Sequence, residues 1–305
     1  MGDFVLYFAG AENLEIPISE EDNCGKLYTF ALGGKRLNKY LDKNIHKCKT
    51  FIDSGAFSMY HSGVKIDIDE YIEYINTTPS PTVFAELDVI PYPVFNTATT
   101  KDSSEGSWEK YLYMMKHVKE EYRDKILPVF HLGEPYSALE RMLNTEVEGR
   151  LVPYICLGGR HGSNSKQHDL YYSNVFNNII SKSKNPKVKV HALGMTVLSL
   201  LEKYPFYSAD STTWLMIGAN GGIQTDTCGM ISVSEVSKKK SSSAWNFPKE
   251  LVIKLNEEVE RKGFTLEQLS KDYRARHSFN AIYFRDWANN YHFKGDNGIK
   301  RRRLF

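Results

Sequence analysis

The chain has few cysteines, and they are scattered. Four occur in 305 residues, Cys24, Cys48, Cys156 and Cys228, and no two of them stand close together. A disulfide scaffold or a zinc ribbon needs cysteines in closely spaced sets. The pattern indicates neither, so the simplest expectation is a reduced, intracellular protein.

Long apolar runs are also missing. No segment approaches the roughly 20 apolar residues that a membrane-spanning helix needs. The first ten residues lack the basic start and the longer apolar run of a signal peptide; they read MGDFVLYFAG. We therefore expect no membrane partner and a cytoplasmic location.

A strong net charge is absent, since the formal charge at pH 7 is +2. The distribution is less even. Residues 248–305 hold 13 Lys and Arg against 8 Asp and Glu, whereas residues 1–247 hold 26 against 29. A basic C-terminal part suits a nucleic-acid contact surface, and a contribution to solubility explains it equally well.

Two nucleotide-binding signatures are absent as well. No Gly-x-Gly-x-x-Gly follows the first apolar stretch, and no Gly-x-x-x-x-Gly-Lys occurs. Instead, short apolar stretches alternate with segments of helical spacing. Eight strands are predicted, at residues 4–8, 27–32, 49–52, 82–87, 126–130, 151–156, 188–192 and 206–209. Eight such units predict an α/β fold of the (β/α)8 TIM-barrel type; an open doubly wound sheet is the alternative. Residues 214–217 are expected to form an extra strand or the closing element of the barrel.

The character of the chain changes near residue 235. We expect a barrel over residues 1–235, a basic, Ser-rich linker over 236–247, and a helical, basic extension over 248–305. Pro248 and Gly263 bracket a first helix, and Thr265 with Gln268 forms a capping box for a second. A third helix, over residues 274–290, carries aromatic side chains that we expect to pack on the barrel rather than stack on bases.

Polar or glycine residues follow most of the predicted strands. They are Asp53, Asp88, His131, Gly158 with Gly159, His191 with Gly194, and Asp210. In a (β/α)8 barrel these strand ends lie on one face, where active sites are built. Each residue alone has an ordinary explanation, such as a helix cap or, for His191, a buried core histidine. Together they predict a site with Asp210 as nucleophile and Asp53 as general acid/base at a sugar anomeric carbon.

Several of these segments resemble the tRNA-guanine transglycosylases, and more closely the phage relatives that insert 7-deazaguanines into DNA. Residues 53–57, DSGAF, resemble the family's Asp-Ser-Gly-Gly-Phe segment. Residues 84–93 resemble its base-recognising strand, residues 157–159 its Gly-Gly loop, and residues 191–195 with 207–211 its nucleophile strand. His131, Leu132 and Gly133 stand where those enzymes have Gln-Gly. The resemblance covers roughly residues 50–216.

The resemblance implies a ping-pong exchange of bases. Asp210 attacks C1′ of a guanosine, guanine leaves with help from Asp53, and a free 7-deazaguanine such as 7-cyano-7-deazaguanine displaces the enzyme. The base would be bound by Ser54, Phe57, Asp88, His131, Gly158, Gly159, His191 and Met195. Arg160, Arg301, Arg302 and Arg303 are expected to contact phosphates. No cofactor is required.

One feature departs from the tRNA enzymes, which carry a Cys-x-Cys-x-x-Cys and His zinc site after the nucleophile. Here only Cys228 lies in that region, so we predict no metal ion. DNA is therefore the expected partner, with tRNA as the alternative. A barrel glycoside hydrolase that uses Asp53 and Asp210 as its carboxylate pair, and a non-catalytic nucleic-acid-binding barrel, are more distant alternatives.

Overall fold

The computed structural model describes residues 4–12, 14–44, 47–63, 65–78, 83–91, 97–159, 162–195, 197–237 and 242–295. The four arginines expected to contact phosphates, Arg160, Arg301, Arg302 and Arg303, lie outside the described residues.

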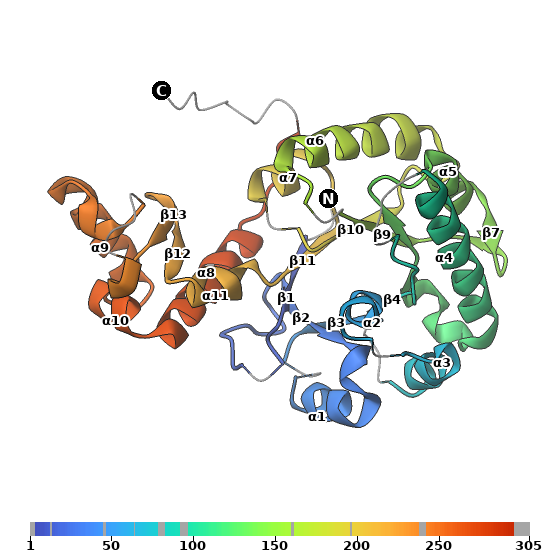
Figure 1. Ribbon diagram of the computed structural model, residues 1–305, viewed down its shortest axis with the longest axis horizontal. Helices are drawn as coiled ribbons and strands as arrows, with labels where there is room; N and C mark the ends of the chain where they lie inside the picture. Colours follow the sequence, from blue (N-terminus) through green and yellow to red (C-terminus); the bar gives the residue numbers. More distant parts are fainter. Residues whose placement is uncertain are drawn as a thin grey trace.

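The chain folds around a nearly closed, barrel-like sheet of nine parallel strands (Figure 1). The strands are β1 (Val5–Ala9), β2 (Cys24–Thr29), β3 (Lys49–Asp53), β4 (Val83–Ala85), β5 (Ile126–Leu127), β6 (Val129–His131), β9 (Tyr154–Gly158), β10 (Lys189–Leu193) and β11 (Ser208–Ser211). Their order in the sheet is β5-β4-β3-β2-β1-β11-β10-β9-β6. The predicted α/β class and barrel-like architecture are confirmed.

The sheet is interrupted at Pro128, which separates β5 from β6. Proline has no N–H to donate, so it interrupts a strand ladder. β5 pairs with β4, whereas β6 pairs with β9. The carboxylate of Glu86 accepts a hydrogen bond from the Val129 amide at 2.7 Å and so satisfies a donor at the break. The single strand expected over residues 126–130 is therefore two short ones.

Alternating side chains of the strands point to two different cores. Tyr7, Phe51 and Cys156 belong to a cluster inside the barrel. Ile52 and Leu157, the next residues along their strands, belong to the larger cluster that the surrounding helices share. A period of two is the signature of strands covered on both faces. The barrel interior is filled with side chains, which leaves the strand ends as the place for a polar site.

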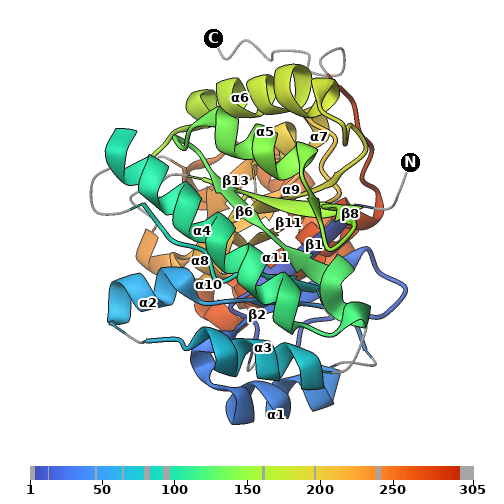
Figure 2. The ribbon, with the colours of Figure 1, turned by 90° about the vertical axis from the view of Figure 1, so that its right-hand side faces the viewer.

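In the barrel region, the described residues form seven α-helices that follow the strands in chain order (Figures 1 and 2). They are α1 (Gly34–Asn44), α2 (Ala56–Ser62), α3 (Ile68–Thr77), α4 (Thr97–His117), α5 (Tyr136–Asn144), α6 (Ser165–Asn174) and α7 (Leu198–Lys203). Local chemistry sets their starts. The Asp67 carboxylate caps α3 by accepting from the amides of Asp69 and Glu70, and Asn164 with Gln167 forms a capping box at α6. None of the described helices is long and apolar enough to cross a membrane.

The strand expected at residues 214–217 is wrong, because these residues lie in helix α8 (Thr213–Ala219). The Ser211 hydroxyl accepts from the Thr213 amide at 2.9 Å at the helix start. Trp214 is buried and donates its indole N–H to the Ala9 carbonyl at 3.0 Å. A four-residue apolar run carries too little periodicity to separate a strand from a buried helical turn.

The C-terminal part has a core of its own. It contains α9 (Lys249–Arg261), α10 (Leu266–Lys271), α11 (Tyr273–Asn289) and a hairpin of β12 (Gly222–Thr225) and β13 (Gly229–Ser232). Ile223 and Ile231 of the hairpin join Leu255, Val259 and Phe279 in one cluster, to the left in Figure 1. The hairpin, at residues expected to belong to the barrel, thus packs with the C-terminal helices. A second hairpin, of β7 (Glu146–Val147) and β8 (Arg150–Leu151), lies beside the sheet.

Helix α11 connects the two cores. Trp287 and Tyr291 lie 5.5 Å and 4.4 Å from Phe4, between ring centroids, at the start of β1. These aromatic rings pack on the barrel, as predicted. The capping box of Thr265 and Gln268 is also confirmed.

Candidate functional site

Three aspartates lie at the carboxyl ends of the barrel strands. Asp53 ends β3, Asp210 stands one residue before the end of β11, and Asp88 follows β4 after two residues. Burial, followed by the negative charges of Asp88 and Asp210, raises the pKa of Asp53 to about 7. The structure therefore brings together, at one end of the sheet, carboxylates that are far apart in the sequence.

Asp210 is held through one of its two carboxylate oxygens. Oδ1 accepts from the imidazole Nε2 of His191 at 3.1 Å and from the amide of Gly194 at 3.0 Å. Gly194 has φ +63°, a left-handed conformation that favours glycine. Oδ2 accepts no hydrogen bond from any residue that the structure describes. With 7% of Asp210 exposed, this second oxygen is the one left for a ligand.

Behind Asp210, His191 is the middle of a buried chain of hydrogen bonds. Its Nδ1 contacts the Ser208 hydroxyl, which in turn contacts the Tyr154 hydroxyl. Phe51 stacks on the imidazole at 4.6 Å between ring centroids. Burial raises the pKa of Tyr154 well above its usual range, so this phenol keeps its proton and donates it. Every hydrogen bond in this series has one donor and one acceptor when Ser208 donates to Nδ1 and the Nε2–H of His191 donates to Asp210.

Sequence reasoning missed Ser208 and Tyr154. Ser208 lies two residues before Asp210 on the same strand, so strand periodicity places both side chains on one face and offered a usable signal. Tyr154 comes from β9, and no local pattern connects it with Ser208.

Asp53 is fixed by the turn that follows β3. Its Oδ2 accepts from the Gly55 amide at 3.1 Å. Gly55 has φ +89°, and a Cβ there would lie 2.7 Å from that of Ala31, so the turn requires glycine. Ser54 is fully buried, with its hydroxyl 3.4 Å from the Ala56 amide at the start of α2. Phe57 is on the first turn of α2 and is 57% exposed.

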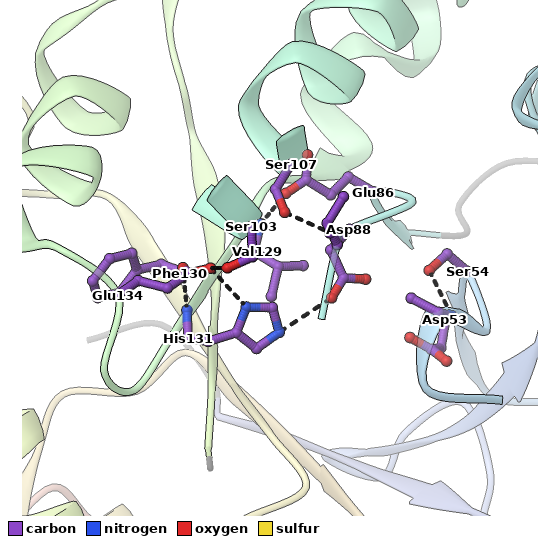
Figure 3. Close-up of polar contacts among 12 residues, drawn as sticks. Asp53, Ser54, Glu86, Asp88, Ser103, Ser107, Val129, Phe130, His131 and Glu134 are labelled. Atoms are coloured by element: carbon purple, nitrogen blue, oxygen red, sulfur yellow. Dashed lines mark hydrogen bonds and ion pairs between the residues drawn. The ribbon is translucent and has the colours of Figure 1, made fainter. Parts of the chain in front are cut away.

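His131, the last residue of β6, lies between two carboxylates (Figure 3). Its Nε2 is 3.1 Å from Asp88 Oδ2, and its Nδ1 is 3.4 Å from Glu134 Oε1. Burial opposes protonation, but the hydrogen bonds and charges of the two carboxylates outweigh it and raise the pKa of His131 to about 10. His131 is therefore a cation at neutral pH. Glu134 was missed, although its position three residues after a strand-ending histidine was visible in the sequence.

Gly158, the last residue of β9, and Gly159, which follows it, leave space for histidine rings. A Cβ on Gly158 would lie 2.6 Å from Cδ2 of His131, and one on Gly159 would lie 2.9 Å from Cε1 of His168. Non-bonded carbon atoms do not approach this closely, so a residue with a side chain at position 158 would displace the His131 ring. Met195, the last predicted base-binding residue, is buried beside Gly194 in the sequence.

A hollow of about 390 Å³ lies beside the loop that follows His131, but the three aspartates, His131 and His191 are not among its lining residues. It lies between the loops that follow β6 and β9, and its lining includes Leu132, Gly133, Tyr136, Ser163, Gln167 and Leu170.

Cys228 lies in the turn between β12 and β13, away from the aspartates. Within the described part of the chain, no group of three or more His, Cys, Asp and Glu side chains is arranged to hold a metal ion. No known protein-family model matches this chain, and no curated protein sequence matches it.

Proposed function

We propose that this protein is a transglycosylase that exchanges guanine in DNA for a free 7-deazaguanine, such as 7-cyano-7-deazaguanine, through a covalent intermediate on Asp210. The observation that carries the proposal is the state of Asp210: one oxygen is held by two donors, the other is available, and Asp53 is close enough for the charge of Asp210 to raise its pKa. We count β5 and β6 as one strand broken at Pro128, and on that count the nine-stranded sheet supports a (β/α)8 barrel. The C-terminal helices are then an extension of it.

In the first step Asp210 is the nucleophile. Its Oδ2 forms a bond to C1′ of the target nucleotide while the bond from C1′ to N9 breaks and its electron pair goes to the guanine. The two donors on Oδ1 hold the carboxylate in one orientation through the reaction.

Asp53 is the general acid and base. A pKa of about 7 means that both of its protonation states are populated near neutral pH, which is the condition for efficient proton transfer in both directions. Its protonated form donates to the departing guanine. Its ionised form accepts the proton of the incoming 7-deazaguanine, whose N9 then displaces Asp210 from C1′.

The base pocket is assigned to the residues around these carboxylates. Asp88 is its hydrogen-bond acceptor, the backbone of Gly158 and Gly159 allows a flat ring to approach closely, and Phe57 is a stacking surface at the mouth. Because Nε2 of His191 already contacts Asp210, we assign His191 to orienting the nucleophile rather than to binding the base. A target guanine in duplex DNA must leave the base stack to reach this pocket, at a cost of a few kcal/mol.

The choice of DNA rests on the resemblance of residues 191–195 and 207–214 to the phage enzymes, and tRNA remains the second candidate substrate. The experiment that decides is incorporation of labelled guanine and 7-cyano-7-deazaguanine into duplex DNA and, in parallel, into tRNA. Wild type is compared with Asp210→Ala and with Asp124→Asn. Asp124 is an exposed carboxylate near the opposite, amino-terminal end of β5, so its variant should exchange bases like wild type.

Label in DNA alone, lost only in Asp210→Ala, is the expected result. Label in tRNA alone would assign the enzyme to the tRNA branch. Label in neither would reject base exchange and return attention to saccharide substrates, for which the same two carboxylates are a suitable pair.

A further inference from the structure

Glu134, which lies just before helix α5, contacts both the backbone and the side chain of His131. Its Oε2 accepts from the His131 amide at 2.8 Å, and its Oε1 lies 3.4 Å from Nδ1 of the same residue. Oε1 also accepts from the Ser103 hydroxyl of α4 at 2.8 Å. Only 4% of Glu134 is exposed. The carboxylate is thus fixed by three groups, with one oxygen aimed at the imidazole (Figure 3).

We propose that Glu134 is a positioning residue for base binding: it keeps His131 a cation, and this cation fixes the Asp88 carboxylate toward the base. The proposal rests on the proposed function, because it concerns the binding of the exchanged base. Both ring nitrogens of His131 face carboxylates, so the ring has no N–H to spare for a ligand. Asp88 Oδ1, in contrast, accepts no hydrogen bond from the residues that the structure describes.

Two carboxylates contact His131, and a third carboxyl group acts on it only through its charge. Asp88 comes from the segment after β4 and Glu134 from the loop after β6. Glu86, the first residue after β4, interacts electrostatically with His131. Burial raises the pKa of Glu86 well above its usual range, and this group accepts from the Val129 amide rather than contacting the imidazole. Asp88 and Glu134 therefore supply the negative charge that holds the imidazolium. The trio of Asp88, His131 and Glu134 carries one net negative charge, which suits a base edge that presents N–H donors.

Glu134→Gln is the most selective change. Glutamine keeps one oxygen, which can accept from the His131 amide in place of Oε2, and puts an NH2 group, which can donate to the Ser103 hydroxyl, in place of Oε1. The charge is removed, and the NH2 group no longer accepts from Nδ1 of His131. Glu86→Gln is the matched control, since it replaces another buried carboxyl group, one that has no hydrogen bond or ion pair with His131 in the described part of the structure. The charge state of His131 is followed by NMR of the labelled imidazole as a function of pH, with no base or nucleic acid present.

In wild type and in Glu86→Gln, His131 should remain protonated above pH 9, in keeping with its pKa of about 10. In Glu134→Gln the pKa of His131 should be lower than in wild type by one unit or more, which is an at least tenfold loss of proton affinity. A wild-type His131 that titrates near the ordinary pH of about 6.5 would overturn the proposal without any variant. So would a Glu134→Gln protein whose titration matches wild type.

Exchange kinetics give the second readout. At a pH between the two transitions, Glu134→Gln should raise KM for the free base about tenfold while kcat changes less than about threefold, because base binding and not the nucleophile is affected. Equal losses in kcat for Glu134→Gln and Glu86→Gln would contradict a positioning role. Failure of the wild type to exchange any base would refute the proposed function alone, since the titration of His131 does not depend on it.

Discussion

Two histidines at the same end of the barrel are held in opposite ways. His191 has a carboxylate on one nitrogen and a hydroxyl on the other. His131 has a carboxylate on each. A hydroxyl can donate or accept a hydrogen bond, so the first arrangement needs only one N–H on the ring, the Nε2–H that faces Asp210. Two carboxylates can only accept, so the second arrangement demands a ring that donates from both nitrogens.

The difference separates two tasks within a small volume. Near Asp210, the buried hydroxyls of Ser208 and Tyr154 orient the nucleophile without adding charge. Near Asp88, the cation of His131 balances carboxylates that would otherwise repel each other. Asp53 lies within reach of both groups, and the charges of Asp88 and Asp210 help to raise its pKa. The predictions below test this division.

The largest effect is expected for Asp210→Asn. An amide oxygen is a poor nucleophile, so base exchange should fall at least about a thousandfold, while the fold is retained because asparagine still accepts from His191 and Gly194. Incorporation of labelled guanine measures the loss. A covalent adduct between enzyme and polynucleotide, trapped by denaturation, should appear with wild type and be absent with the variant; an adduct of equal yield would reject Asp210 as the nucleophile.

Next in size is the effect of His131→Gln on stability. The substitution leaves Asp88 and Glu134 buried without their cation, at a cost of about 3–5 kcal/mol in the free energy of unfolding. His191→Gln breaks one hydrogen bond to the Asp210 carboxylate and one to the Ser208 hydroxyl, leaves no pair of carboxylates without a cation, and should cost less, about 1–3 kcal/mol. Urea unfolding of both variants at pH 6 makes the comparison, and equal losses would contradict the difference between the two sites.

The contribution of His131 to the free energy of unfolding should depend on pH. The pKa of His131 is raised from 6.5 to about 10 on folding. Its stabilising contribution is therefore complete below pH 6.5 and is lost as the pH rises through about 10. The difference in unfolding free energy between wild type and His131→Gln should shrink over this interval.

A smaller effect, about a hundredfold, is expected for Asp53→Asn in the release of guanine. With a pKa of about 7, Asp53 is protonated below neutral pH, so single-turnover guanine release by wild type should fall as the pH rises through 7. The variant has no group to titrate there, and its residual rate should be flat. If the wild-type rate of guanine release did not fall as the pH rises through 7, Asp53 would not be the general acid.

The sequence was sufficient to place Asp53, Asp88, His131 and Asp210, because each follows a short apolar stretch and parallel strands end on one side. It was not sufficient for their partners. Ser208 and Tyr154 are 54 residues apart and touch only because β9, β10 and β11 are neighbours in the sheet. The direction of a hydrogen bond and the charge of a histidine depend on such contacts between distant residues. These contacts produce no regular pattern in the sequence.

Other errors have the same origin. Residues 214–217 were apolar enough for a strand, but the indole of Trp214 donates to Ala9 of β1, more than 200 residues away, and the segment is helical. The hairpin β12-β13 went unnoticed because its apolar side chains face the C-terminal helices and follow no barrel unit. The sequence predicted the barrel strands and helices best where apolar residues recur at one constant spacing along the whole segment.

The smallest effect, and the one that tests the hydroxyl chain directly, is expected for Ser208→Ala. Without the Ser208 hydroxyl, Nδ1 of His191 loses its donor, and the ring is no longer restricted to the orientation in which Nε2–H faces Asp210. We expect kcat to fall about tenfold with KM for the free base unchanged, since this chain orients the nucleophile and does not touch the base pocket. Tyr154→Phe removes only the outer link and should cost about threefold, because Ser208 can still donate to His191. The order of the two losses is the decisive result: a larger loss in Tyr154→Phe than in Ser208→Ala would mean that Tyr154 acts through packing in the barrel interior, and that His191 is oriented by its stacking on Phe51 instead.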